Sequence, residues 1–119
     1  MGKTVVATRG LDNCLFLYTI KEWKNISENL STLGMGQADT RGLSRFMFSG
    51  AVEVEVDSIG RILVPDFLKE FAKLGESVVF AGINNRVEIW NEELWMEYKK
   101  KIEKQGDILA EKLGEIGVF

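Results

Sequence analysis

Asp57, Ser58, Gly60 and Arg61 form a short stretch whose residue types and spacing suit binding chemistry. A glycine followed by an arginine at a hairpin tip lets the backbone turn sharply and projects a guanidinium. That group can donate two hydrogen bonds to a phosphate or to the edge of a guanine. Asp57 could accept hydrogen bonds from backbone N–H groups and hold the loop in place. Taken alone, the stretch is a weak signal, and an ordinary β-turn with a surface arginine remains the alternative.

The sequence offers little for catalysis. It contains no histidine, so a Ser-His or Cys-His nucleophile cannot form, and acid–base work would fall to carboxylates. Glu53 and Glu55 would lie side by side on one strand face, but a solvated face opposite the valines of residues 52–56 is the simpler interpretation. Residues 34–36 lack the context of a phosphate-binding loop. We therefore expect a protein that is not an enzyme and takes no small-molecule substrate.

Composition narrows the possible partners further. The 119 residues, 45% hydrophobic and 28% charged, suit a globular domain with a packed core. The net charge of −3 means that any binding to nucleic acid must come from a local basic surface. Cys14 is the single cysteine, which excludes an intramolecular disulfide and a zinc or iron–sulfur ligand set. We expect Cys14 to be buried, no metal or cofactor, no membrane span or signal peptide, and a cytoplasmic protein.

One segment of the chain occurs twice. Residues 8–18 with Trp23 align without gaps on residues 80–90 with Trp95, and both 82 − 10 and 95 − 23 give an offset of 72. This pattern indicates two copies of one supersecondary unit. Asp57–Pro65 precedes the second copy, but subtracting 72 from these positions lands before Met1. We therefore expect the first copy to lack its leading hairpin, and Met1 to be an internal methionine of a longer frame or a cloning boundary.

Hydrophobic periodicity predicts the elements of the first half. Two antiparallel strands are expected at residues 4–8 and 14–18. Thr19 and Glu22 have the spacing of a capping box, so a helix should span residues 20–33. Residues 34–37 should break it. A second helix should carry Leu43, Phe46 and Met47, with Arg41 and Arg45 four residues apart on a neighbouring face.

The second half repeats this plan after an extra hairpin. Strands are expected at residues 52–56 and 61–64, followed by a helix with Pro65 at its first position and a left-handed cap at Gly75. The repeated hairpin should span residues 78–81 and 86–90. Asn91 should cap a last helix that Gly106 loosens midway. Its apolar stripe would consist of Trp95, Tyr98, Ile102, Leu109 and Leu113.

These motifs together resemble a known family. Asp-x-x-Gly-Arg-Ile-x-x-Pro after an alternating strand, followed by Val-Val-x-x-Gly-x-x-x-Arg-x-Glu-Ile-Trp, resembles the C-terminal half of MraZ, of the AbrB-like swapped-hairpin group. Residues 8–18, the Glu22-Trp23 pair and the linker 45–51 are similar to the rest of that family. The resemblance implies an α+β fold, a swapped-hairpin β-barrel of two repeats with linker helices and a C-terminal helix. Residues 1–49 would form an incomplete first repeat with the linker helices, and residues 50–119 a complete second repeat.

The same resemblance implies a function. It implies a cytoplasmic, nucleoid-associated transcription regulator that forms ring-like homo-oligomers and binds promoter repeats upstream of the division and cell-wall gene cluster. Arg61 would read the DNA from a loop made with Gly60, Ser58 and Asp57. Arg41 and Arg45 are further DNA-binding candidates, with a solvated helix face as the alternative. An incomplete barrel would expose apolar strand surface, so the chain would borrow a hairpin from another copy.

A second hypothesis belongs to a different class. The chain could be an oligomerising interaction module without DNA binding of its own, which the negative net charge favours. Its surfaces would be the stripe around Trp95, Tyr98 and Ile102 and the aromatic linker of residues 46–48. Salt separates the two hypotheses, because electrostatic DNA binding weakens steeply with salt whereas assembly through apolar area does not.

Overall fold

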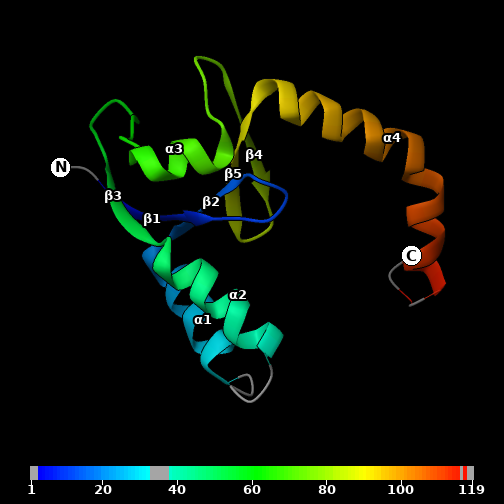
Figure 1. The fold of residues 1–119 in the computed structure, drawn as a ribbon, viewed down its shortest axis with the longest axis horizontal. Helices are drawn as coiled ribbons and strands as arrows, with labels where there is room; N and C mark the ends of the chain where they lie inside the picture. Colours follow the sequence, from blue (N-terminus) through cyan, green and yellow to red (C-terminus); the bar gives the residue numbers. More distant parts are fainter. Residues whose placement is uncertain (1–2, 33–37, 116, 118–119) are drawn as a thin grey trace.

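The computed structural model describes residues 3–32, 38–115 and 117, and contains five strands and four helices in this part of the chain (Figure 1). In chain order these are β1 (Lys3–Arg9), β2 (Leu15–Thr19), α1 (Ile20–Thr32), α2 (Ala38–Ser49), β3 (Val52–Val56), α3 (Asp66–Ala72), β4 (Val78–Ile83), β5 (Arg86–Asn91) and α4 (Glu92–Glu115). The expected break at residues 34–37 lies outside the described residues.

The five strands form one antiparallel sheet in the order β3-β1-β2-β5-β4. The hairpin β1–β2 and the hairpin β4–β5 meet where Leu15 of β2 lies opposite Ile89 of β5. β3 crosses from the second half of the chain to pair with β1, with Val54 opposite Val5. The two halves therefore interleave in a single sheet, which confirms the predicted α+β fold of two repeats.

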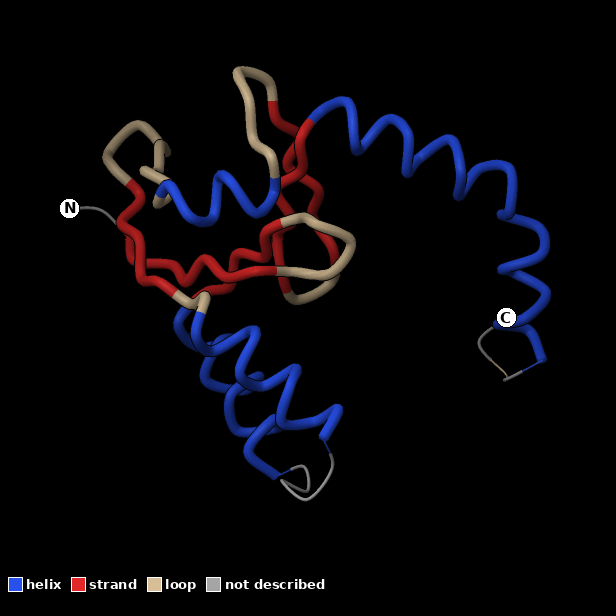
Figure 2. Tube along the Cα trace, in the orientation of Figure 1, coloured by secondary structure: helices blue, strands red, loops and turns tan. Residues whose placement is uncertain are grey.

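Strand alternation divides the core between the two faces of the sheet. Figure 2 shows α3 on one side of the β1–β2 strands and α1 and α2 on the other. On one face, Leu15 and Ile89 pack with Leu68 and Ala72 of the short helix α3, and all four side chains are buried. On the other face, a cluster of aromatic and apolar side chains packs beneath α1, α2 and the start of α4. Its buried members are Cys14, Phe16, Tyr18, Leu30, Met47 and Trp90.

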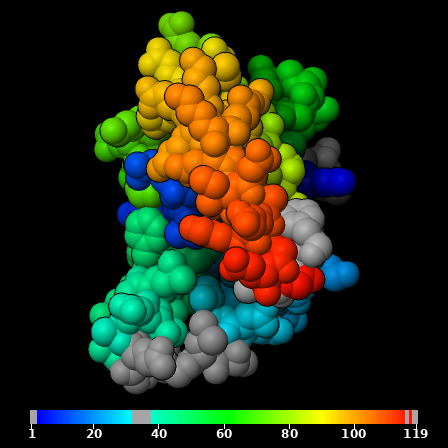
Figure 3. All heavy atoms as spheres, turned by 90° about the vertical axis from the view of Figure 1, so that its right-hand side faces the viewer, coloured from blue at the N-terminus to red at the C-terminus, as the bar shows by residue number. Residues whose placement is uncertain are grey.

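Two of the predicted helix starts, at Thr19 and at Asn91, are confirmed by their capping bonds. The Glu22 N–H donates to Thr19 Oγ1 at 3.1 Å, and the Leu94 N–H donates to Asn91 Oδ1 at 3.0 Å. α4 continues as a helix through Gly106, and Figure 1 shows it bending partway along its length. Trp95 and Tyr98 at its start pack on the sheet. The remainder projects away from the sheet in Figure 1, and Figure 3 shows α4 running across that side of the molecule.

The predicted strand at residues 61–64 is wrong. These residues form an extended connection from the turn to α3, and no strand of the described chain pairs with them. Leu63 accordingly is 81% exposed. The helix that follows is also shorter than expected: Pro65 lies at the N-cap rather than the first helical position. Lys73, with φ of 54°, is the left-handed C-cap instead of Gly75, and its N–H donates to the Glu70 carbonyl.

The two hairpins differ by one residue, which the gapless alignment did not show. Leu17 and Ile89 are 72 positions apart, but their strand partners Ala7 and Phe80 are 73 apart, since 80 − 7 = 73. The extra residue lies in the first connection, where the Gly10 N–H donates to the Cys14 carbonyl and encloses residues 11–13. The second connection is a two-residue turn closed by the pair Ile83 and Arg86.

Candidate nucleic-acid interface

The turn after β3 is held together by one carboxylate. Asp57 Oδ1 accepts hydrogen bonds from the backbone N–H of Ile59 at 3.0 Å and of Arg61 at 2.8 Å. Asp57 Oδ2 accepts a third from Arg61 Nε at 2.9 Å. Backbone bonds between Asp57 and Arg61, and from the Gly60 N–H to the Asp57 carbonyl, close the turn. A side chain that bonds its own turn in this way fixes the loop without help from the rest of the fold.

Glycine is required at position 60 by the backbone. Its φ of +85° lies in the region that side chains with a Cβ rarely adopt, although nothing within 4 Å would block such an atom. The requirement is therefore conformational rather than steric. The positive φ at Gly60 makes the chain turn sharply enough for the Arg61 N–H to reach the Asp57 side chain.

The Arg61 guanidinium contacts Asp57 through one nitrogen, and most of the side chain is exposed. Its side chain is 74% exposed and its ion pair with Asp57 uses Nε, so the two Nη groups lie beyond that contact. The hydrogen bond from the Arg61 backbone is the largest influence on Asp57, and with the Arg61 side chain it holds the Asp57 pKa below its usual range. Asp57 therefore loses its charge at a lower pH than an aspartate without these hydrogen bonds. A guanidinium with a free outer edge can donate to a phosphate oxygen or a guanine acceptor.

The surroundings of the turn are mixed in charge. Ser58 is exposed, and Ile59 beside it is 69% exposed at the tip. A surface hollow of about 640 Å³ beside the turn is lined by Ser58 and Arg61 as well as by the acidic residues Asp57 and Glu55. The turn therefore offers both donors to an anion and carboxylates that would repel one.

Arg41 and Arg45 do not join this turn. Both belong to α2, which extends from the side of the sheet opposite to α3, whereas the turn lies at the α3 side (Figure 1). Arg45 is exposed and lines a hollow between α1 and α2 with Leu30 and Phe48. The structure therefore brings Asp57, Ser58, Gly60 and Arg61 together and leaves the two α2 arginines on a separate surface.

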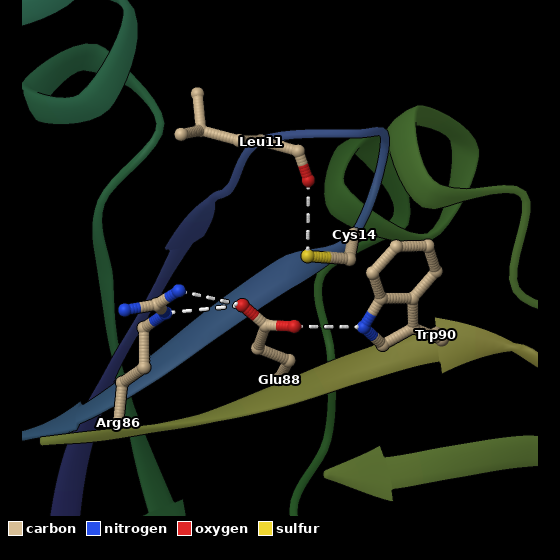
Figure 4. A network of polar contacts seen from close by, with 5 residues as sticks. All are labelled: Leu11, Cys14, Arg86, Glu88 and Trp90. Atoms are coloured by element: carbon tan, nitrogen blue, oxygen red, sulfur yellow. Dashed lines mark hydrogen bonds and ion pairs between the residues drawn. The ribbon is translucent and has the colours of Figure 1, made fainter. Parts of the chain in front are cut away.

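A buried polar network on β5 was missed at the sequence level (Figure 4). Glu88, 8% exposed, accepts hydrogen bonds from Arg86 Nε at 3.1 Å, Arg86 Nη2 at 2.9 Å and Trp90 Nε1 at 3.0 Å. The Arg86 guanidinium also lies 4.3 Å from the ring centre of Phe16. The spacing of Arg86, Glu88 and Trp90 could have predicted this network, because residues two apart on a strand share a face. This cluster joins the two hairpins and is structural.

Glu53 and Glu55 lie as the sequence predicted, exposed on either side of buried Val54. Cys14 is also buried as expected, and its Sγ donates to the Leu11 carbonyl. Burial raises the pKa of the Cys14 thiol to about 12, with the nearby Glu88 carboxylate adding to the shift. None of the helices in the described chain has both the length and the apolar character that a membrane crossing needs.

Comparisons with known proteins agree with the motifs. The family described as "MraZ protein, putative antitoxin-like" matches residues 1–46 and 47–112. The chain is 48% identical, over 99% of its length and 82% of the relative's, to "Transcriptional regulator MraZ" of Caldanaerobacter subterraneus subsp. tengcongensis. It is 46% identical over the same shares to the protein of that name from Thermoanaerobacter pseudethanolicus. It is 50% identical, over 95% and 79%, to that of Heliobacterium modesticaldum. The chain belongs to the MraZ family.

Proposed function

We propose that this protein is a DNA-binding transcription regulator that contacts DNA through the turn of Asp57, Ser58, Gly60 and Arg61. Membership of a family whose relatives are named transcriptional regulators supports regulation of transcription and argues against an enzyme. The geometry of the turn is the observation that supports it as the DNA-contacting surface. Three hydrogen bonds to Asp57 fix its shape while the outer edge of Arg61 faces solvent.

The finer features of the proposal follow from the family resemblance. The protein would act in the cytoplasm at the nucleoid, on promoter repeats of the division and cell-wall gene cluster, as a ring-like homo-oligomer. Several copies would each contribute a weak contact, because one turn with one arginine cannot supply the affinity of a specific complex. The division into repeats at residues 49 and 50 is part of the same proposal. Arg41 and Arg45 could add contacts to phosphate from their separate surface.

The roles within the turn differ. Arg61 would make the contact with a base edge or a phosphate, whereas Gly60 and Asp57 set its position. Ser58 could donate its hydroxyl to a neighbouring phosphate. Holding Nε on Asp57 leaves one edge of the guanidinium for DNA, and it removes part of the side-chain entropy that binding would otherwise cost.

The test is binding of the full chain to a duplex carrying short promoter repeats, measured by fluorescence anisotropy at two salt concentrations. Arg61→Ala should weaken binding by about 1–3 kcal/mol per contact, or roughly 5- to 150-fold. If Arg61 contacts a base, the loss should fall mainly on the repeat duplex and not on a scrambled one. If it contacts phosphate, both duplexes should lose affinity and the salt slope should shrink by about 1.

Two variants serve as controls. Lys21→Ala removes one exposed positive charge from α1 and should leave binding unchanged. Asp57→Asn keeps one acceptor for the turn but removes its charge, and should weaken binding less than Arg61→Ala does. Unchanged affinity in Arg61→Ala would reject the proposed surface. A wild-type chain that assembles but ignores both duplexes would favour the alternative of an interaction module.

A further inference from the structure

The hollow between α1 and α2 lies apart from the proposed DNA contact. Its volume is about 420 Å³, which falls in the size range of small-molecule sites in proteins. Most of its surface is apolar. The residues that line it come from both helices and are Leu30, Ser31, Ser44, Arg45, Phe48 and Ser49. An apolar interior with a few polar groups is the usual make-up of a ligand site.

The hydroxyl of Ser44 has no hydrogen-bond partner in the described chain. Ser44 is 8% exposed, and its Oγ is the one buried side-chain polar atom of the described residues in this condition. Thr8, by contrast, is buried and donates from Oγ1 to the Met47 carbonyl at 2.7 Å. A buried hydroxyl without a partner is destabilising, since it has lost its hydrogen bonds to water. Packing of α2 alone therefore does not explain the hydroxyl, because alanine would avoid this cost.

The other two serines of the hollow already have partners. Ser31 Oγ donates to the Ser27 carbonyl at 2.8 Å, and Ser49 Oγ accepts from Arg9 Nη1 at 3.2 Å. A serine hydroxyl has a single proton to donate. Ser31 has used its proton within α1, whereas the proton of Ser44 has no acceptor in the described chain. Ser44 is thus a hydrogen-bond donor available to a ligand.

Arg45 determines the charge that a ligand should carry. It is the only charged residue among the described ones that line the hollow, and its side chain is exposed. Within the described part of the chain it forms no ion pair. The guanidinium only donates hydrogen bonds, and a carboxylate only accepts them. The polar groups of the hollow therefore match an anion.

Leu30 and Phe48 provide an apolar wall beside these donors. Leu30 is buried, and Phe48 is 39% exposed with its ring 5.6 Å from that of Trp23 in an edge-on contact. A ligand with an apolar body would remove the exposed part of this wall from water. A DNA phosphate could reach Arg45, but it would gain nothing from the apolar wall. The surface therefore suits a small amphipathic anion better than a nucleic-acid backbone.

We propose that the hollow between α1 and α2 binds a small organic anion with an apolar body, of the class of aromatic or fatty carboxylates. The carboxylate accepts hydrogen bonds from Arg45 and from Ser44, whose hydroxyl turns toward the ligand by rotation about χ1. The apolar body packs on Leu30 and Phe48. The proposal does not rest on DNA binding, because the hollow and the turn of residues 57–61 lie on separate surfaces.

The test uses 2-naphthoate as the probe and follows the amide signals of the full ¹⁵N-labelled chain by NMR. Signals of the residues that line the hollow should shift to saturation with one naphthoate per chain. The 2-naphthylmethylammonium ion has a similar shape and the opposite charge, and it should bind about 10-fold more weakly or less. A second cavity, of about 530 Å³ and lined by Leu63 and Phe80, lies beside β4 and provides a comparison. Saturation only at that cavity, no saturable shift at the hollow, or equal affinity for both probes would overturn the proposal.

Variants of the lining residues test the roles of the donors. Arg45→Ala should weaken naphthoate binding about 10-fold, and Ser44→Ala about 3- to 10-fold. Ser44→Ala should leave the urea unfolding midpoint unchanged or higher, because it removes a hydroxyl without a partner. Ser31→Ala is the matched control and should bind as the wild type does, since that hydroxyl already donates within α1. Wild-type affinity in Arg45→Ala, or a lower midpoint in Ser44→Ala, would refute the assigned roles.

Discussion

Replacing Glu88 by alanine should destabilise the fold by about 3 kcal/mol. The Glu88 side chain is 11% exposed and its carboxylate accepts three hydrogen bonds, two from Arg86 and one from Trp90. Alanine would leave the buried indole N–H without an acceptor. It would also leave the guanidinium, stacked over Phe16, without its counter-ion.

The magnitude follows from how well solvent can replace each contact. A buried donor without a partner costs about 1–3 kcal/mol, and we assign about 2 kcal/mol to the Trp90 indole. Breaking a fully buried ion pair costs about 3–5 kcal/mol, but Arg86 is 27% exposed, so we reduce its share to about 1 kcal/mol. With a urea m-value of about 2 kcal/mol/M, the unfolding midpoint should fall by about 1.5 M.

Urea unfolding followed by far-UV circular dichroism measures this shift without relying on the fluorescence of Trp90 itself. Glu88→Gln should cost less than Glu88→Ala, since its carbonyl can still accept from the indole. Glu53→Ala, at an exposed carboxylate on β3, should stay within about 0.5 kcal/mol of wild type. A Glu88→Ala midpoint within a few tenths of a molar of wild type would refute the reasoning.

Gly10 and Cys14 give two more tests of the packing around the first connection. A Cβ at Gly10 would lie 2.5 Å from Phe16 Cδ1 and 2.9 Å from the Cys14 carbonyl oxygen, so Gly10→Ala should lower stability by about 1–3 kcal/mol in thermal melts. Gly42→Ala should not lower stability, because no atom lies within 4 Å of a Cβ at that position. Burial raises the folded pKa of Cys14 from 9.0 to about 12, so the thiol of the unfolded chain ionises first as pH rises. The free energy of unfolding should therefore fall across that pH interval, and it should fall less in Cys14→Ala. Rapid labelling of Cys14 by a thiol reagent in the native protein near pH 8 would contradict its burial.

The sequence predicted elements whose cause is local. Alternation in residues 52–56 placed Glu53 and Glu55 outward, and the hydroxyl of Thr19 marked the start of α1 as its capping bond shows. The hydrogen-bonding capacity of Asp57 toward its own turn could likewise be read from a few adjacent residues. Such features depend on backbone propensity and on neighbours three or four positions away.

The features that the sequence did not predict depend on residues far away in the chain. Residues 61–64 have the apolar composition of a strand, but a strand needs a partner, and the described chain supplies none beside them. The cavity lined by Leu63 and Phe80 lies beside β4, and β4 is an edge strand because of the order of the whole sheet rather than because of its own sequence. The proposed DNA contact of Arg61 stays a prediction, since geometry alone does not name a ligand.

The position of β1 between β2 and β3 bears on how the chain folds during synthesis. Ala7 meets Leu17 within its own hairpin, but it meets Val52 only after the ribosome has added the residues in between. The β1–β2 and β4–β5 hairpins can form locally in microseconds, whereas joining Leu15 to Ile89 must await most of the polypeptide. Until β3 emerges, the first hairpin has two uncovered edges, and the β2 edge stays uncovered until β5 is made. Its lifetime in that state is set by the rate of translation, at about 5–20 residues per second, rather than by its own stability.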